Sequence, residues 1–234
     1  MRELLKGTTV GWLGHSAVLV QTKAGTTLLI DPFITGNPKF PAGYVMPAKV
    51  DYILLTHGHG DHLGDAVQLA TKYDATVVAV YELAAYVAGK AGAKIIGMNL
   101  GGSVKLGDVT ATMTDAKHSA GAQDDKGTHY TGVAAGFVLT INGGPVLYHA
   151  GDTAVFTDMK LIEELYHPDV AMLPIGGHYT MGPREAALAV KFLKPKLVLP
   201  IHYGTFPPLV GRPEELQALV PGVEVVKMEP GENL

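Results

Sequence analysis

The stretch Thr56-His57-Gly58-His59-Gly60-Asp61-His62 holds four side chains that can bind a metal within six residues. The mostly apolar segment 50–55 before it is typical of a buried strand, and the segment 63–70 after it has the pattern of an amphipathic helix. The four side chains therefore lie on a turn between strand and helix, where the two glycines let the backbone fold tightly beside an ion. We expect His57 and His59 to face one metal, and Asp61 and His62 to reach a second. Because burying these groups together is costly without an ion, the stretch favours a metal site.

The composition indicates a folded globular protein. Of the 234 residues, 47% are hydrophobic, which is enough for a sizeable core. The formal net charge is -4 and no dense basic tract occurs, so the sequence argues against nucleic acid as a partner. The chain has no cysteine, which excludes disulfides, a thiolate nucleophile and thiolate metal ligands. Any metal must therefore be held by histidine and aspartate.

Neither a secretory signal nor a membrane segment is expected from the sequence. The N-terminal segment 1–7 is too short and too charged for a signal, and no apolar run reaches the roughly 18 residues that a membrane span needs. We therefore expect a cytoplasmic protein without a membrane partner.

The apolar pattern predicts strands at the start of the chain and alternating strands and helices later. The expected helices are 63–73, 82–91, 159–166, 183–193 and 212–219, and residues 119–129 are expected to form a polar loop. The irregular segment 33–49, rich in proline and aromatic residues, is interpreted either as a lid over the metals or as a packed surface loop. With no linker rich in serine or glycine, the pattern favours one α/β domain over residues 1–234, with two packed sheets and helices outside.

Three further candidate ligands lie at or just past the ends of apolar strands, namely His118, Asp152 and His202. Loops at strand ends are where a rigid scaffold presents reacting groups. Together with the opening stretch they make seven oxygen or nitrogen ligands, which is too many for one tetrahedral ion and suits two ions with a shared carboxylate. The imidazole-rich set favours zinc, while iron, manganese and nickel stay open.

The order of these residues along the chain resembles the metallo-β-lactamase fold superfamily. The segments 12–16, 148–153, 176–182 and 201–205 narrow the resemblance to a branch of predicted metal-dependent hydrolases, the UPF0173 group, which is related to the L-ascorbate-6-phosphate lactonases. The resemblance covers nearly the whole chain. It implies a four-layer αββα sandwich, an α/β (α+β) fold of two mixed sheets, with the metals at one edge of the sheets.

The resemblance also implies a role for each ligand. One metal would be held by His57, His59 and His118, the other by Asp61, His62 and His202, and Asp152 would bridge the two. Asp31 matches an early aspartate of the family that supports the metal loop without binding the ion, as carboxylates around a metal site often do.

These ligands predict a metal-dependent hydrolase that acts on a small-molecule lactone, ester or phosphoester. Two divalent cations that share a water lower its pKa from about 15.7 toward 7, so that hydroxide can attack a carbonyl or phosphoryl centre. Asp61 is expected to orient this nucleophile and carry its proton. His178, in a glycine-flanked loop, is expected to touch the substrate or stabilise an oxyanion. The candidate catalytic residues are therefore Asp61, Asp152 and His178.

Other functions stay open at this point. One is a phosphodiesterase or nuclease, although the chain is short for the inserted domain of the superfamily's RNA nucleases. Another is diiron redox chemistry, although such members usually carry a glutamate where this chain has His59, together with a flavin domain. A third is a metal-bound module that binds without catalysis.

Two side chains and the oligomeric state also have alternatives. His15 either contacts the substrate or only hydrogen-bonds a loop, and Tyr203 is either a donor or part of the core. A homo-oligomer stays open because relatives often associate.

Overall fold

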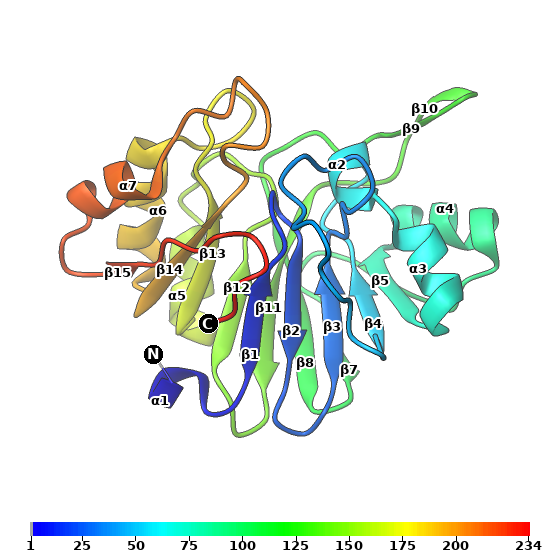
Figure 1. Cartoon of the computed structure of the whole chain (residues 1–234), viewed down its shortest axis with the longest axis horizontal. Helices are drawn as coiled ribbons and strands as arrows, with labels where there is room; N and C mark the ends of the chain where they lie inside the picture. The colour runs from blue at the N-terminus through cyan, green and yellow to red at the C-terminus, as the bar shows by residue number, and fades with distance from the viewer. Residues whose placement is uncertain (1) are drawn as a thin grey trace.

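Two β-sheets lie face to face in the computed structural model of this protein, which describes residues 2–234 (Figure 1). The first sheet consists of β1 (Thr9–Trp12), β2 (Val18–Gln21), β3 (Thr27–Ile30), β4 (Tyr52–Leu54), β5 (Thr76–Val80) and β6 (Ile95–Met98). These strands lie in chain order, with antiparallel pairing from β1 to β3 and parallel pairing from β3 to β6.

The second sheet repeats this arrangement of antiparallel and then parallel strands. It consists of β7 (Ser103–Leu106), β8 (Val109–Asp115), β11 (Ala135–Ile141), β12 (Val146–His149), β13 (Val170–Pro174), β14 (Leu197–Ile201) and β15 (Glu224–Val225). Pairing is antiparallel from β7 through β8 and β11 to β12, and parallel from β12 to β15. Both sheets are therefore mixed.

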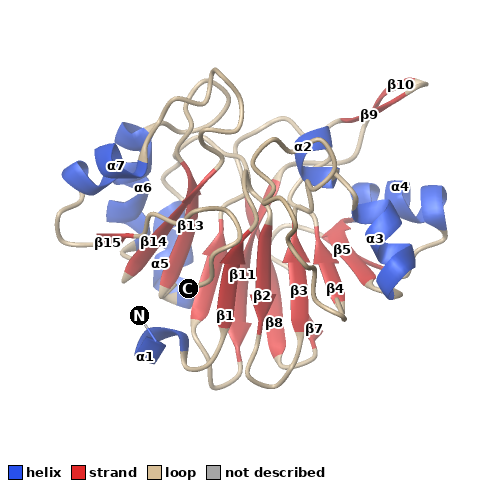
Figure 2. Ribbon diagram, in the orientation of Figure 1, coloured by secondary structure: helices blue, strands red, loops and turns tan. Residues whose placement is uncertain are grey.

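Helices cover the outer faces of the two sheets (Figure 2). The helices are α1 (Arg2–Leu5), α2 (Gly60–Leu63), α3 (Ala66–Tyr73), α4 (Tyr81–Ala91), α5 (Met159–Tyr166), α6 (Pro183–Leu193) and α7 (Pro213–Leu219). On the first sheet, α3 and α4 pack against β5 and β6, while α5, α6 and α7 share an apolar cluster with the second sheet. The layers are thus helix, sheet, sheet and helix, as predicted.

The core lies between the sheets, with a second apolar layer under the helices of the second sheet. Phe137 and Leu139 of β11 belong to the central cluster, together with Leu29 of β3. Val138, between them in sequence, faces the outer cluster with Leu173. This alternation follows from the two-residue period of a strand, and it makes the strand apolar on both faces.

The predicted helix over residues 63–73 is wrong as a single element, because α2 ends at Leu63 and α3 begins at Ala66. Gly64 has a positive φ of 43°, and a Cβ there would lie 2.7 Å from the carbonyl carbon of Pro32. The Asp65 carboxylate accepts the backbone N–H groups of Ile34 (2.9 Å) and Thr35 (2.8 Å). The break therefore anchors the start of the segment 33–49 beside the metal-binding turn.

Two other predicted segments can be compared with the structure. The segment 33–49 holds no helix or strand, as expected, and its function as a lid stays a prediction. The polar segment 119–129 is not only a loop, because it contains a hairpin of β9 (Ala122–Asp124) and β10 (Gly127–His129) that projects from the body (Figure 1). Within residues 2–234, every helix is too short or too polar to span a bilayer.

Candidate metal centre

The predicted ligands meet because four strands end at the same side of the sandwich. In the second sheet, β8, β12 and β14 run in one direction, since β11 is antiparallel to both β8 and β12 and the strands from β12 to β14 are parallel. His118, Asp152 and His202 follow the ends of these three strands. The loop after β4 brings the opening stretch from the other sheet to the same place. All seven predicted ligands fall into groups that could hold a metal.

The first group contains only imidazoles, those of His57, His59 and His118, and their candidate ligand atoms lie within 4.8 Å of one another. His57 Nε2 and His59 Nδ1 are 3.0 Å apart. The ring of His118 lies across both, with centroid distances of 5.2 Å to His57 and 5.1 Å to His59. Three imidazoles are a common ligand set for zinc.

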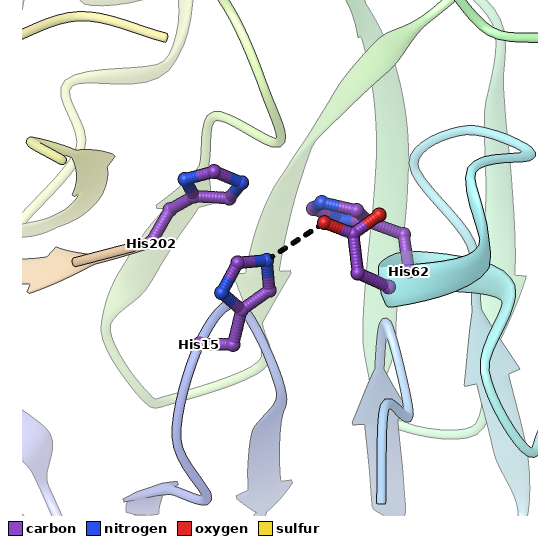
Figure 3. A group of neighbouring side chains, drawn as sticks. His15, His62 and His202 are labelled. Carbon is purple, nitrogen blue, oxygen red and sulfur yellow. Dashed lines mark hydrogen bonds and ion pairs between the residues drawn. The ribbon is translucent and has the colours of Figure 1, made fainter. Parts of the chain in front are cut away.

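The second group contains Asp61, His62 and His202, as predicted, and it also contains His15. Figure 3 shows the rings of His15, His62 and His202 close together, with a dashed line from His15 to a carboxylate. The carboxylate that lies 3.1 Å from His15 Nε2 is that of Asp61. The ring centroids of His15 and His202 are 4.1 Å apart. The presence of His15 in this group is the main feature that sequence reasoning missed.

Asp152 forms a third group with His57 and His62, so this third group shares one histidine with each of the first two. Its Oδ2 atom is 3.0 Å from His202 Nε2, 3.2 Å from His62 Nε2 and 3.7 Å from His118 Nε2. It therefore approaches ligands of both groups, which is the position that a bridging carboxylate requires.

Unpaired polar atoms at this centre test whether cations fit it. Among the described residues, His62 Nε2, Asp152 Oδ1 and His202 Nδ1 are buried and have no hydrogen-bond partner. His62 Nε2 is near Asp152 but not aligned for a hydrogen bond. Buried polar atoms are nearly always paired, so such a cluster of nitrogen and oxygen donors fits cations as the missing partners.

The charges at the centre are strongly coupled. Burial lowers the pKa values of His57, His59 and His118, which favours the neutral imidazole that binds metals. Burial also acts to lower the pKa of His62, but the carboxylates of Asp152 and Asp31 outweigh it and hold that pKa well above its usual value. Burial acts to raise the pKa of Asp152, and His62 and His202 reverse this, so the carboxylate stays ionised.

Asp31 orients one ligand of each group without belonging to either. It is fully buried and accepts hydrogen bonds from the Thr56 backbone N–H (2.8 Å), the Thr56 hydroxyl (2.6 Å) and His62 Nδ1 (2.8 Å). Since the only proton of the Thr56 hydroxyl goes to Asp31, the hydroxyl accepts from His57 Nδ1 at 3.0 Å. In both histidines Nδ1 is thereby engaged, so Nε2 is the nitrogen that can face a metal, as hydrogen bonds around metal sites commonly arrange.

His15 is held by two side chains that are distant in sequence. It is fully buried, has a positive φ of 56°, and its Nε2 lies 3.1 Å from Asp61 Oδ2 while its Nδ1 lies 3.0 Å from Thr205 Oγ1. Burial lowers its pKa to about 4, partly offset by the hydrogen bond with Asp61. A neutral ring satisfies both contacts when Nε2–H donates to Asp61 and the Thr205 hydroxyl donates to Nδ1.

The two glycines of the turn have different roles. A Cβ at Gly58 would meet Thr131 Oγ1 and would lie 2.7 Å from the carbonyl oxygen of Ala120, whereas a Cβ at Gly60 would meet nothing within 4 Å. Glycine is therefore required at position 58 by close packing against the chain around Ala120, and room beside an ion stays a prediction.

A cavity of about 500 Å³ opens onto the centre. Its lining includes Asp61 and Asp152, and beyond the ligands it includes Ser119, Tyr179, Phe206 and Pro208. His178 is exposed and does not line this cavity, whereas its neighbour Tyr179 does, so a catalytic role for His178 stays a prediction.

Tyr203 and His149 have packing or structural contacts. The Tyr203 ring stacks on Trp12 at a centroid distance of 5.2 Å, which agrees with the interpretation as core packing. His149, the last residue of β12, donates from Nε2 to the Ser16 carbonyl and accepts the Gly151 N–H. His149 thereby fixes the loop that carries Asp152.

Comparisons with known proteins show similarity along nearly the whole chain. A family model described as a β-lactamase superfamily domain matches residues 26–203. A UPF0173 metal-dependent hydrolase of Koribacter versatilis is 47% identical over 98% of both chains, and one of Caldivirga maquilingensis is 50% identical over 95% of this chain and 96% of its own. Among solved structures, Igni18, a metallo hydrolase from the hyperthermophilic archaeon Ignicoccus hospitalis, has a TM-score of 0.87 and 38% identity over 97% of each chain.

Proposed function

The chain belongs to the β-lactamase superfamily, within its UPF0173 branch of metal-dependent hydrolases, and from this premise we propose that it uses two divalent cations to hydrolyse a small-molecule lactone, ester or phosphoester. The observation that carries the proposal is the place of Asp152 between two separate groups of ligands. One carboxylate within 3.7 Å of ligand atoms from both groups suits a pair of neighbouring cations better than a single one.

Each group of ligands would hold one cation. His57, His59 and His118 would hold the first, Asp61, His62 and His202 the second, and Asp152 would contact both. The predominance of imidazole favours zinc, although manganese, iron and nickel also accept such ligands. Cations bound there would polarise the substrate oxygen that gains negative charge and lower the pKa of a water at the site.

Asp61 is the residue placed to handle the proton of the attacking water. It lines the cavity, its side chain is 32% exposed, and His15 fixes one of its two oxygens. Burial acts to raise the pKa of Asp61, but the hydrogen bond from His15 and the charge of His62 outweigh it and hold that pKa below its usual value. The carboxylate is therefore ionised at neutral pH, so it can accept a hydrogen bond from the water and orient it, and we assign to Asp61 the transfer of the water proton to the leaving group.

The test combines metal analysis with a panel of substrates. Protein loaded with zinc is expected to bind two equivalents and to hydrolyse at least one class among aryl esters, lactones and bis(4-nitrophenyl) phosphate. Asp152→Ala is expected to bind at most one equivalent and to lose turnover, because both groups lose a shared ligand. Two tightly bound ions in Asp152→Ala would contradict the bridge, and full metal without turnover on the whole panel would favour a binding module instead.

A further inference from the structure

One wall of the cavity at the metal centre is apolar. Beyond the ligands and Ser119, the lining consists of Tyr179, Phe206 and Pro208, which we call the apolar wall. The Phe206 ring packs edge-on against His15, at a centroid distance of 5.6 Å, and lies 6.3 Å from Phe33, so it is held in place. Tyr179 remains 57% exposed. Exposed apolar surface directly beside a reactive centre indicates a ligand that covers it.

The carboxylates of Asp61 and Asp152 are among the described side chains that line the cavity. None of the described residues that line it is a lysine or an arginine. Lys117 directly precedes His118 but pairs with Asp115, and Lys39 comes close to Gly204 without reaching the lining. Because proteins usually bind phosphate and carboxylate groups through arginine or lysine, a charged group at the far end of a substrate would find no partner here.

A second cavity of about 460 Å³ adjoins the first. It shares His59, Asp61 and Ser119 with the first cavity and extends to Gln123 and Thr128 of the hairpin β9–β10. Its lining likewise holds no lysine or arginine among the described residues. The reacting bond can therefore lie where the two cavities meet, beside the carboxylate of Asp61 and with no lysine or arginine among the described lining residues.

Resting on the proposed function, we propose that the substrate is an uncharged carboxylic ester or lactone whose aromatic or branched apolar group lies against the apolar wall. In its hydrolysis the oxygen of water bonds to the acyl carbon, and the bond from that carbon to the alcohol oxygen breaks. One proton of the water passes through Asp61 to the leaving alcohol oxygen, and the other stays with the new carboxylic acid. A phosphorylated lactone that turned its phosphate toward the apolar wall would be disfavoured, because the wall of Tyr179, Phe206 and Pro208 offers no cation.

Binding of two simple carboxylates tests the wall without turnover. 4-Phenylbutyrate and glutarate each offer one carboxylate to the metals, but they carry a phenyl ring or a second carboxylate at the other end. Calorimetric titration of zinc-loaded protein is expected to give a dissociation constant at least about tenfold lower for 4-phenylbutyrate, since removing only about 60 Å² of apolar surface from water suffices for that factor. Equal binding of the two, or binding of neither, would overturn the proposal.

Turnover of two esters with one leaving group tests the same preference during catalysis. 4-Nitrophenyl butyrate is expected to have a kcat/KM at least about tenfold above that of 4-nitrophenyl hemisuccinate, which ends in a carboxylate. Pro208→Lys places a cation on the wall and is expected to reduce this ratio at least about fivefold, as an added opposite charge should. Val210→Lys is the matched control, because Val210 is 74% exposed two residues away, outside the lining, and the ratio should not change.

The two experiments separate the proposal from the function on which it rests. Tighter binding of 4-phenylbutyrate without turnover of any ester would support the apolar wall as a ligand-binding surface but contradict the proposed hydrolase activity. Turnover that favours the hemisuccinate, or a ratio unaffected by Pro208→Lys, would leave the hydrolase standing and refute the apolar substrate.

Discussion

Replacing His15 with asparagine is expected to weaken only the second metal site. Asparagine tolerates the positive φ of 56° at this position, so the backbone is preserved, but its shorter side chain cannot span the 3.1 Å contact from His15 Nε2 to Asp61 Oδ2. A hydrogen bond to a charged acceptor contributes about 1.5–3 kcal/mol, and the lower end applies because the Asp61 side chain is 32% exposed and water can replace part of the bond. About 1.5 kcal/mol corresponds to about a tenfold loss of affinity.

The assay is competition between the protein and a chromophoric chelator for zinc, analysed as two sites at neutral pH. One site should keep the wild-type affinity, and the other should weaken about tenfold. Thr205→Val serves as a control, because it removes the partner of His15 Nδ1 but leaves the donor to Asp61 in place, so its effect should be smaller. Wild-type affinity at both sites would mean that His15 only packs, while complete loss of one zinc equivalent would mean that His15 is itself a ligand.

Gly58→Ala should lower the free energy of unfolding by about 1–3 kcal/mol in urea titrations, because its Cβ would crowd Ala120. Gly60→Ala, whose Cβ would enter open space, should change it by less than about 1 kcal/mol, and equal effects would contradict the close packing assigned to Gly58. Asp31→Asn should cost about 3–5 kcal/mol, since a buried carboxylate with three donors loses its charge. Asp31 and Asp74 both have a positive φ, but Asp74 is exposed beside Lys94, so Asp74→Asn should lower the free energy of unfolding by less than about 1 kcal/mol. A similar loss of stability at both positions would refute a special role for Asp31. Removing metal with EDTA should lower Tm by about 8–16 °C, because a ligand at a thousandfold excess over its Kd adds about 4 kcal/mol of stability; an unchanged Tm in calorimetry would argue against bound metal.

The ligand set could be predicted from the sequence because its chemistry is local. Four ligands lie within the opening stretch, and the other three follow apolar strands whose ends a mixed sheet can bring together. The αββα sandwich was confirmed by the structure and by the family match, since strands that are apolar on both faces require a sheet on one side and helices on the other.

The environment of the ligands could not be predicted in the same way. The contact between His15 and Asp61 joins residues 46 positions apart, and the one between His15 and Thr205 joins residues 190 apart, so no local pattern announces them. Tyr179 lines the cavity and its neighbour His178 does not. Which of two neighbouring loop residues faces the cavity depends on local backbone angles such as the φ of 57° at His178, which the sequence does not reveal. The hairpin β9–β10 was missed because its strands are short and polar and carry no strand pattern.

Asp31 and His15 support the metal centre in ways that metal analysis can tell apart. Asp31 reaches His62 directly and His57 through the Thr56 hydroxyl, so one carboxylate orients a ligand in each group. Among the described ligands, His15 forms a hydrogen bond only with Asp61, which belongs to the second group. The loss of Asp31 should therefore weaken both cations together, whereas the loss of His15 should weaken one. If Asp31→Asn left one site at wild-type affinity, the hydrogen bonds from His57 through Thr56 to Asp31 would have no part in holding the first metal.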